Sequence, residues 1–113
     1  MPTIDLEVIA TDTKYRTVKW PSLEDGDDGK VADVGQYPDR SLQITGTLGG
    51  AVPSLEGSMD RVTWFQLTSD GVTAIGALGM FWVWENPKFT RPKNVGGDGT
   101  TDVTYQLGMS TLV

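Results

Sequence analysis

One stretch of the chain, Gly46–Leu67, constrains the fold most because it has the pattern of two strands joined by a tight turn. Strand-forming residues fill Val52–Gly57 and again Val62–Thr68, and Ser58–Arg61 lies between the two segments. Two such segments on either side of a short polar turn are typical of an antiparallel hairpin. This part of the chain therefore predicts a β protein.

Six further segments carry strand patterns. The first, Ile4–Ala10, alternates apolar and acidic residues, so we expect Ile4, Leu6 and Val8 to point inward. In the last, Val103, Tyr105 and Leu107 share one face. The four segments between these two are bounded by turn residues, and Pro21 is expected to end the segment Tyr15–Trp20. In chain order, the last five segments are Tyr15–Trp20, Ser41–Thr47, Val72–Ile75, Met80–Trp84 and Thr101–Met109.

Together these patterns predict about eight short strands at regular spacing, with no convincing helix. Such an arrangement is typical of an all-β fold, and we predict an antiparallel β-sandwich of jelly-roll type. A length of 113 residues suits a single domain, residues 1–113. An acidic segment of about residues 21–40 is expected to form a long loop, and loops of that length are usually functional or mobile.

The balance of charge argues against nucleic acid and membrane partners. The formal net charge is −6, and an acidic protein repels phosphate groups. The longest apolar run, Ala77–Trp84, is too short to span a bilayer, and Met1–Ala10 lacks the pattern of a signal peptide. We therefore expect a protein made in the cytoplasm, with neither nucleic acid nor membrane as a partner.

The charges are unevenly distributed along the chain. Residues 21–40 hold six acidic and two basic residues, a net charge of −4, whereas residues 85–93 have a net charge of +2. These two segments can meet across a subunit boundary, or they can both be solvated loops.

The residues required for catalysis or for a cofactor are scarce. The chain has no His and no Cys, which removes the usual general base, thiolate zinc sites and disulfides. The acidic turn Asp25–Gly29 departs from the calcium-binding EF-hand spacing, and Gly96–Asp102 matches a calcium-binding nonapeptide only loosely. The paired glycines lack the Gly-Lys-Ser/Thr of a phosphate-binding loop. We expect no enzyme activity, no cofactor and no metal.

Four tryptophans in 113 residues leave three interpretations open. Trp20, Trp64, Trp82 and Trp84 can pack in the core, contact another protein, or form a platform for sugar rings. Trp64 follows a turn within a strand and is expected in the core. Met80–Trp84 is apolar on both faces, which indicates either a central strand covered on both sides or a strand at an interface.

Three segments in order resemble a family of small structural proteins of tailed bacteriophages. Leu55–Leu67 resembles the pattern G-S-x-D-G-x-x-W-x-x-L, Glu85–Pro92 resembles E-N-P-R-Y-I-R-P, and Gly96–Leu107 resembles G-G-D-G-T-T-S-L-T-V-x-L. Arg61 stands where the first pattern has Gly, and Lys88 and Phe89 replace Arg and Tyr. The first two segments also resemble the galactose-binding-like jelly roll of discoidin-type domains.

The resemblance implies a virion protein, foremost a capsid decoration (cement) protein on the outside of the head, with the major capsid protein as partner. It also implies a homo-oligomer such as a trimer. The alternatives are a neck, tail or head-fibre component and a carbohydrate-binding module for host attachment. Because the family motifs mark positions in the fold, the interface residues come from exposed apolar patterns instead. We expect them in two groups, Ile4, Leu6 and Val8 near the N-terminus and Met80, Trp82 and Trp84 in the apolar segment.

Overall fold

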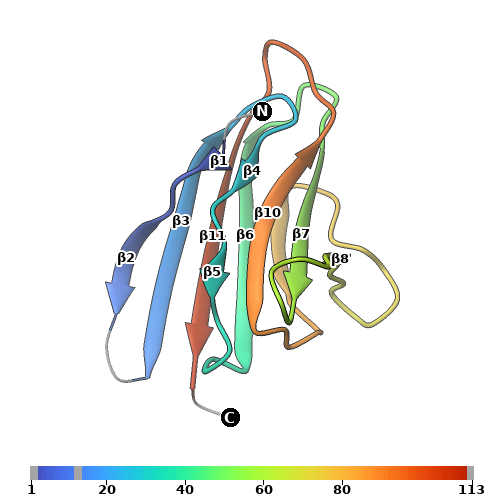
Figure 1. Cartoon of the computed structure of the whole chain (residues 1–113). Coiled ribbons are helices and arrows are strands. Elements are labelled where there is room, and N and C mark those ends of the chain that lie inside the picture. Colours follow the sequence, from blue (N-terminus) through green and yellow to red (C-terminus); the bar gives the residue numbers. More distant parts are fainter. Residues whose placement is uncertain (1–2, 12–13, 112–113) are drawn as a thin grey trace.

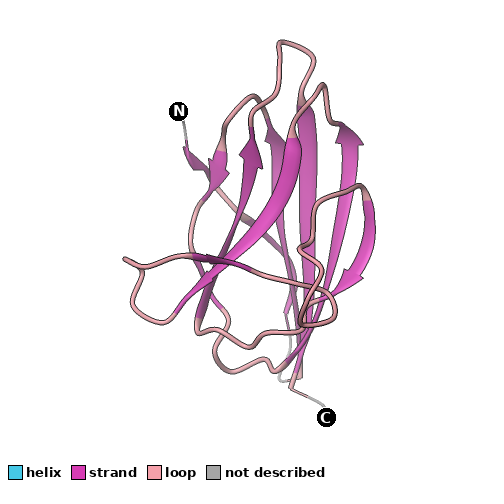
Figure 2. Ribbon diagram, turned by 90° about the vertical axis from the view of Figure 1, so that its right-hand side faces the viewer, coloured by secondary structure: helices cyan, strands magenta, loops and turns pink. Residues whose placement is uncertain are grey.

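A computed structural model of the chain describes residues 3–11 and 14–111. Two β-sheets pack face to face, as the two views in Figures 1 and 2 show, and the described residues contain no helix. The strands are β1 (Thr3–Ile4), β2 (Glu7–Thr11), β3 (Tyr15–Leu23), β4 (Asp28–Gly29), β5 (Ala32–Asp33), β6 (Asp39–Thr47), β7 (Val52–Ser58), β8 (Phe65–Gln66), β9 (Gly79–Trp82), β10 (Phe89–Val95) and β11 (Asp102–Ser110).

The order of the strands is that of a jelly roll. One sheet, here called sheet A, has the order β1-β4-β10-β7-β8, with β5 paired to β10; the other, sheet B, has the order β2-β3-β11-β6-β9. Without β1, β2 and β5, the two sheets have the orders β4-β10-β7-β8 and β3-β11-β6-β9, which are the two four-stranded sheets of a jelly roll made of two Greek keys. The predicted antiparallel sandwich of jelly-roll type is confirmed, with one parallel pair, β1 and β4, added at an edge.

The core lies between the sheets and follows directly from residue alternation. Leu42 and Ile44 of β6, and Val103, Tyr105 and Leu107 of β11, are almost completely buried, while their neighbours in sequence face solvent. A strand that is covered on one face shows this period of two. The predicted inward faces of these two strands are correct.

The N-terminal segment departs from its prediction as a single strand. The chain crosses from sheet A, where β1 pairs with β4, to sheet B, where β2 pairs with β3. Ile4 and Leu6 pack against the core, but Val8 stays 51% exposed. Val8 lies opposite the buried Val18 and thus on the inner face of the sheet. It remains exposed because β2 is the edge strand of sheet B. Ala10, the last residue of the predicted strand, lies in β2, and its side chain is outside the described part of the structure.

The expectation that Pro21 ends the second predicted strand is wrong. β3 continues to Leu23 because Pro21 and Ser22 lie at a β-bulge between the pairs Tyr105–Trp20 and Val103–Leu23. Ser22 takes a positive φ of 56°, and its backbone N–H donates to the Thr104 hydroxyl. A bulge accommodates a proline that a regular ladder would exclude.

The acidic segment is not a plain loop, contrary to the prediction. It contains β4 and β5, and both strands pair with β10. Val34 and Tyr37 are buried, and Arg40, which begins the inward face of β6, is 1% exposed. The Arg40 guanidinium donates to the backbone oxygens of Tyr37 and Val34, both at 2.7 Å, and burial lowers the pKa of Arg40 to about 10. The segment is therefore part of the sandwich.

The hairpin is present but shorter than predicted. β7 pairs with β8, which contains only Phe65 and Gln66, and residues 61–64 belong to the turn. The predicted strand Val72–Ile75 is reduced to one bridge between Thr68 and Ala74. Tight hydrogen bonding in the turns accounts for both differences, since Asp60 and Asp70 each accept backbone N–H groups two and three residues ahead.

Candidate interaction surfaces

Two of the three segments that resemble phage proteins, the first and the third, each close a turn. Asp60 Oδ1 accepts the backbone N–H groups of Val62 and Thr63, and these bonds lower the pKa of Asp60. At the third segment, the side chain and backbone of Thr100 donate to Asp98 Oδ1 and lower the pKa of Asp98 in the same way. These motifs are explained by local structure.

In the second segment, Glu85 ties one strand connection to another. Its carboxylate accepts the backbone N–H of Thr68 at 2.8 Å and the Thr68 hydroxyl at 2.7 Å. Desolvation raises the pKa of Glu85, but the bonds from Thr68 outweigh it, so the pKa is lowered. A carboxylate held ionised in this way is the opposite of a general acid, whose pKa must be raised.

Two of the acidic residues that suggested calcium, Asp27 and Asp28, have partners within the protein. Asp27 is 2% exposed and accepts the backbone N–H of Glu24, while Asp28 accepts the Thr3 hydroxyl. Among residues 3–11 and 14–111, no group of three or more Asp and Glu side chains is placed to hold a metal ion. No helix in the described part of the chain is long and apolar enough to cross a membrane.

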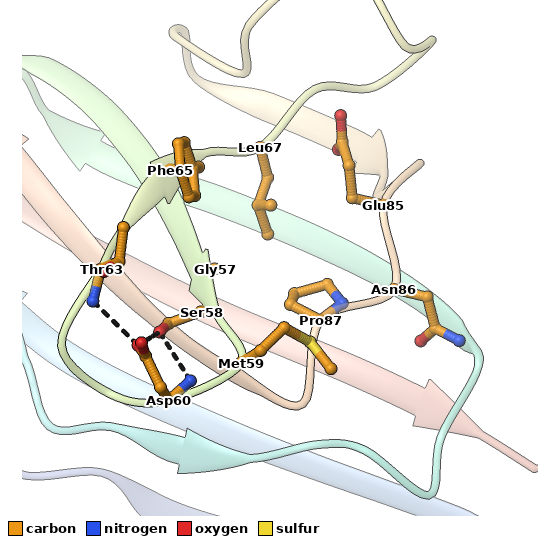
Figure 3. Close-up of a pocket in the computed structure, with 10 residues that line it drawn as sticks. All are labelled: Gly57, Ser58, Met59, Asp60, Thr63, Phe65, Leu67, Glu85, Asn86 and Pro87. Atoms are coloured by element: carbon orange, nitrogen blue, oxygen red, sulfur yellow. Dashed lines mark hydrogen bonds between the residues drawn. The ribbon is translucent and has the colours of Figure 1, made fainter.

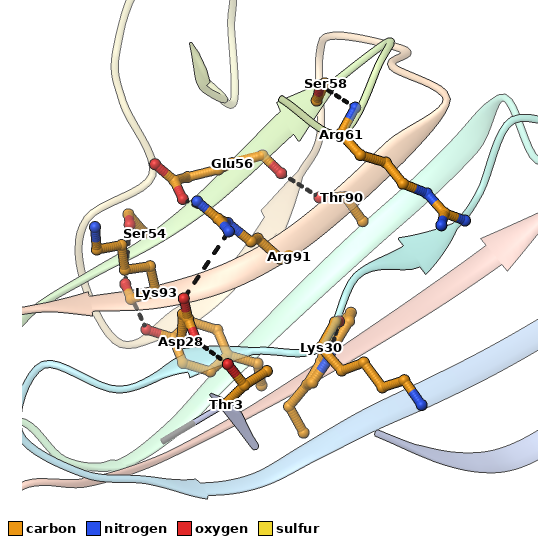
Figure 4. Close-up of polar contacts among 12 residues, drawn as sticks. Thr3, Asp28, Lys30, Ser54, Glu56, Ser58, Arg61, Thr90, Arg91 and Lys93 are labelled. Atoms are coloured by element: carbon orange, nitrogen blue, oxygen red, sulfur yellow. Dashed lines mark hydrogen bonds and ion pairs between the residues drawn. The ribbon is translucent and has the colours of Figure 1, made fainter. Parts of the chain in front are cut away.

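The acidic and basic segments meet inside one chain. Arg91 of β10 lies between Glu56 of β7, 3.0 Å from Nε, and Asp28 of β4, 3.9 Å from Nη1 (Figure 4). The Arg91 guanidinium also lies 4.1 Å from the centre of the Trp64 ring. Asp28 of the acidic segment and Arg91 of the basic segment lie on neighbouring strands of sheet A, so this contact is neither across a subunit boundary nor between solvated loops.

The tryptophans differ in their environment. Trp20 is fully buried and donates from Nε1 to the Lys30 backbone oxygen at 2.9 Å. Trp64, expected in the core, is only partly buried, beneath Arg91. Trp82 and Trp84 are 52% and 54% exposed. Of the three interpretations, core packing thus applies to Trp20, and contact with a partner or a sugar stays open for Trp82 and Trp84.

Met80, Trp82 and Trp84, here called the aromatic edge, lie on and just after β9. This strand is the edge of sheet B, so the interpretation as a central strand covered on both faces is wrong. Met80 is 66% exposed, and the rings of Trp82 and Trp84 meet edge to face with centroids 5.4 Å apart. Phe81 and Val83, by contrast, point toward the core. The two rings contact each other and leave an apolar surface exposed to water.

The other predicted group lies at the far side of the molecule. β2, which carries Val8, is one edge of sheet B, and β9 is the other. Ile4 and Leu6 are partly buried against the core and so serve the fold of this chain. Of the three N-terminal candidates, Val8 is the one that the structure leaves exposed, together with its neighbour Ile9.

Sequence reasoning missed a pocket of 380 Å³ at the end of the β7–β8 hairpin (Figure 3). Met59 and Phe65 stand at this pocket, 70% and 68% exposed, while Leu67 and Pro87 are buried. Two of the three family-like segments converge here, Gly57–Asp60 and Glu85–Pro87. Their resemblance to the family patterns was a signal in the sequence for these two segments. That the segments lie close together, however, depends on how the strands pair.

Comparison with known proteins gives the fold only. No family model matches the chain, and no curated protein matches it in sequence. Among solved structures, it resembles the SPBc2 prophage-derived protein YomS, with a TM-score of 0.62 and 13% identity over 88% of this chain and 97% of that one. A cupin domain from Bordetella pertussis Tohama I has a TM-score of 0.48 and 13% identity over 96% and 95% of the two chains, too low a score for any argument.

Proposed function

We propose that this chain is a structural protein of a tailed-phage virion, most specifically a capsid decoration protein that binds the major capsid protein. The observation that supports this proposal most is the distribution of the exposed apolar side chains along the chain. Of thirteen large hydrophobic side chains exposed among the described residues, eight lie between residues 59 and 84. Such exposure on a soluble domain marks a surface for partners. The fold shared with prophage-derived YomS and the resemblance of the three segments support the phage assignment.

The proposed contact surface extends from the β7–β8 pocket to the aromatic edge. The pocket can receive an apolar side chain of the capsid protein, and Trp82 and Trp84 are residue types that dominate binding energy. An interface of about 1,200–2,000 Å² is the standard size for specific binding. Binding repeated over many copies holds neighbouring capsid subunits together. We propose a non-catalytic protein on the capsid exterior.

We further propose that the protein is a homo-oligomer such as a trimer. Sheet B presents an unpaired edge strand at each end, with Val8 and Ile9 exposed at one end and the aromatic edge at the other. Contact of the β2 edge with the β9 edge of the next copy is head-to-tail, and such contacts form a ring when the rotation closes.

Counting copies in purified particles by quantitative mass spectrometry tests the proposal. A decoration protein is expected in hundreds of copies, and particles that lack it should lose resistance to heat. A neck or tail component would be present in about 5–12 copies, as ring symmetry requires. That count would overturn the capsid assignment and leave the broader virion assignment in place.

Rebinding of variants to particles that lack the protein locates the surface. Phe65→Ser should weaken rebinding by about tenfold or more, because it removes an exposed ring beside the pocket. Val95→Ser, a similarly exposed apolar residue outside residues 59–84, is the matched control and should rebind like the wild type. Equal rebinding of both variants would rule out the β7–β8 pocket.

A further inference from the structure

The outer face of sheet B carries a groove that the pairing register creates. Thr17 of β3, Gly108 of β11, Ser41 of β6 and Trp82 of β9 lie side by side in one row across four strands. Three of the four side chains are small or absent, and the row ends on an indole. Four neighbouring strands span three spacings of about 4.8 Å, so the row is about 14 Å long.

Larger side chains flank this row on both sides. The next row along the strands contains Lys19, Gln106, Gln43 and Met80, and the row on the other side contains Tyr15, Ser110 and Asp39. Two hollows of 240 and 180 Å³ lie on this face, and both are lined by Thr17, Ser41 and Gly108. The hollows meet at this row, one on the side of Tyr15 and Asp39 and the other on the side of Gln43 and Gln106, and together they form one groove over β3, β11 and β6.

The groove offers hydrogen-bonding side chains with little charge. Of the ten residues that line the two hollows, Asp39 is the one charged residue, and no Lys or Arg is among them. Four of the polar side chains make no hydrogen bond to another described residue, so their polar groups are available to a ligand: Thr17, Ser41, Gln43 and Gln106. Lys19 lies in the flanking row on β3 and lines neither hollow, so the lining itself, with Asp39 and no cation, disfavours phosphates and other anions.

The paired backbone beneath the groove argues against an extended peptide. A peptide strand binds to a sheet by hydrogen bonds to an unpaired edge, whereas the backbone beneath this groove is already paired between β3, β11 and β6. Hydroxyl and amide side chains both donate and accept, which matches a ligand rich in hydroxyl groups. Trp82, supported by Trp84, supplies an exposed indole on which the apolar face of a sugar ring can stack.

We propose that this groove binds a neutral oligosaccharide chain, with Thr17, Ser41, Gln43 and Gln106 contacting hydroxyl groups and Trp82, which stands beside Ser41 on the rim, stacking on a ring. Asp39, two residues before Ser41 on β6, accepts a further hydroxyl. The site goes beyond capsid binding: it shares Met80 and Trp82 with the aromatic edge but neither Phe65 nor the β7–β8 pocket, so rebinding of Phe65→Ser and glycan binding test the two proposals separately. A protein with both surfaces could attach a particle to glycans.

Isothermal titration calorimetry tests the proposal with hexasaccharides of cellulose, chitin and starch as neutral probes and a polygalacturonate hexasaccharide as the anionic one. At least one neutral probe should bind the full chain and change its tryptophan fluorescence. Gly108→Val fills the space above Gly108 in the groove and should weaken binding by about tenfold or more. A Cβ at Gly108 meets nothing closer than the Ser41 backbone oxygen at 3.9 Å, so this variant should fold.

Thr45→Val is the matched control, on the same outer face but outside the groove lining, and should bind within about twofold of the wild type. Trp82→Ala is a second groove variant and should remove the fluorescence response. Failure of every neutral probe, preference for the anionic probe, or full binding by Gly108→Val would overturn the proposal. If Gly108→Val instead impaired only rebinding to particles, the groove would be a protein contact and the glycan proposal would be wrong.

Discussion

At the scale of single residues, the most consequential polar group is Asn94, which is completely buried. Its Nδ2 donates to the backbone oxygens of Leu23 and Glu24, both at 2.9 Å, and its Oδ1 accepts the Tyr105 hydroxyl at 2.6 Å. Asn94 thus joins β10 in sheet A to β3 and β11 in sheet B. Burial raises the pKa of Tyr105, so its hydroxyl stays a donor at neutral pH.

We expect Asn94→Ala to lower the free energy of unfolding by about 3 kcal/mol, because it leaves several buried groups unpaired. Tyr105→Phe removes one bond from the same network and should cost about 1 kcal/mol. Urea denaturation followed by tryptophan fluorescence measures both variants. Equal losses would mean that Asn94 does not hold the network together.

Three turn carboxylates make stability depend on acid. Hydrogen bonds from the following backbone lower the pKa values of Asp60 and Asp70 below their unfolded values, and bonds from the hydroxyl and backbone of Thr100 do the same for Asp98. A depressed folded pKa contributes stability above the unfolded value, near 3.9 for Asp, that is lost as pH falls through the folded value. The free energy of unfolding should therefore fall from about pH 5 to about pH 2.

The variant Asp60→Asn/Asp70→Asn/Asp98→Asn should show a shallower decline over this range, since amides accept the same bonds without titrating. Urea midpoints at several pH values compare the two proteins. Parallel curves would assign the acid sensitivity to other groups, such as Glu85.

At the scale of elements, the short strand β4 depends on a glycine. A Cβ on Gly29 would lie 2.6 Å from the Pro92 side chain and from the Trp20 ring, so only glycine lets β4 lie over Trp20. Lys30, the next residue, accepts the Trp20 indole N–H on its backbone oxygen. The acidic segment is therefore held in sheet A by close packing on a core tryptophan.

Gly29→Ala should destabilise the protein by about 1–3 kcal/mol through overpacking. Gly108→Ala, in the open groove on β11, should change stability by no more than about 0.5 kcal/mol. Thermal and urea unfolding of the pair measure the difference. Similar stability of the two variants would show that β4 can shift without cost.

At the scale of the whole molecule, the two edges of sheet B decide assembly in the proposed ring. Val8→Lys places a charge on the β2 edge, which is a device that natural sheets use against edge pairing. Because Val8 is half exposed, the monomer should keep its fold. Sedimentation velocity should show the wild type as an oligomer and Val8→Lys as a monomer. Glu7→Lys, on the opposite face of β2, controls for charge, and a monomeric wild type would exclude the ring.

Much of the strand pattern could be read from the amino-acid order. Ser41–Thr47 and Thr101–Met109 were correctly predicted because each alternates in and out of the core, and that pleat is a local property of an extended chain. The same alternation, extended by one step from Leu42, would have revealed the burial of Arg40. The exposed apolar residues Met80, Trp82 and Trp84 were also singled out by local pattern.

Features that arise from the pairing of strands distant in sequence could be seen only in the folded chain. Pairing with β10 turns an apparent loop into β4 and β5, and the edge position of β2 leaves Val8 uncovered. The row of Thr17, Gly108, Ser41 and Trp82 exists because four strands, separated by up to 91 positions between Thr17 and Gly108, adopt one register. Alternation specifies which way a side chain points, whereas its neighbours across the sheet are chosen by long-range pairing.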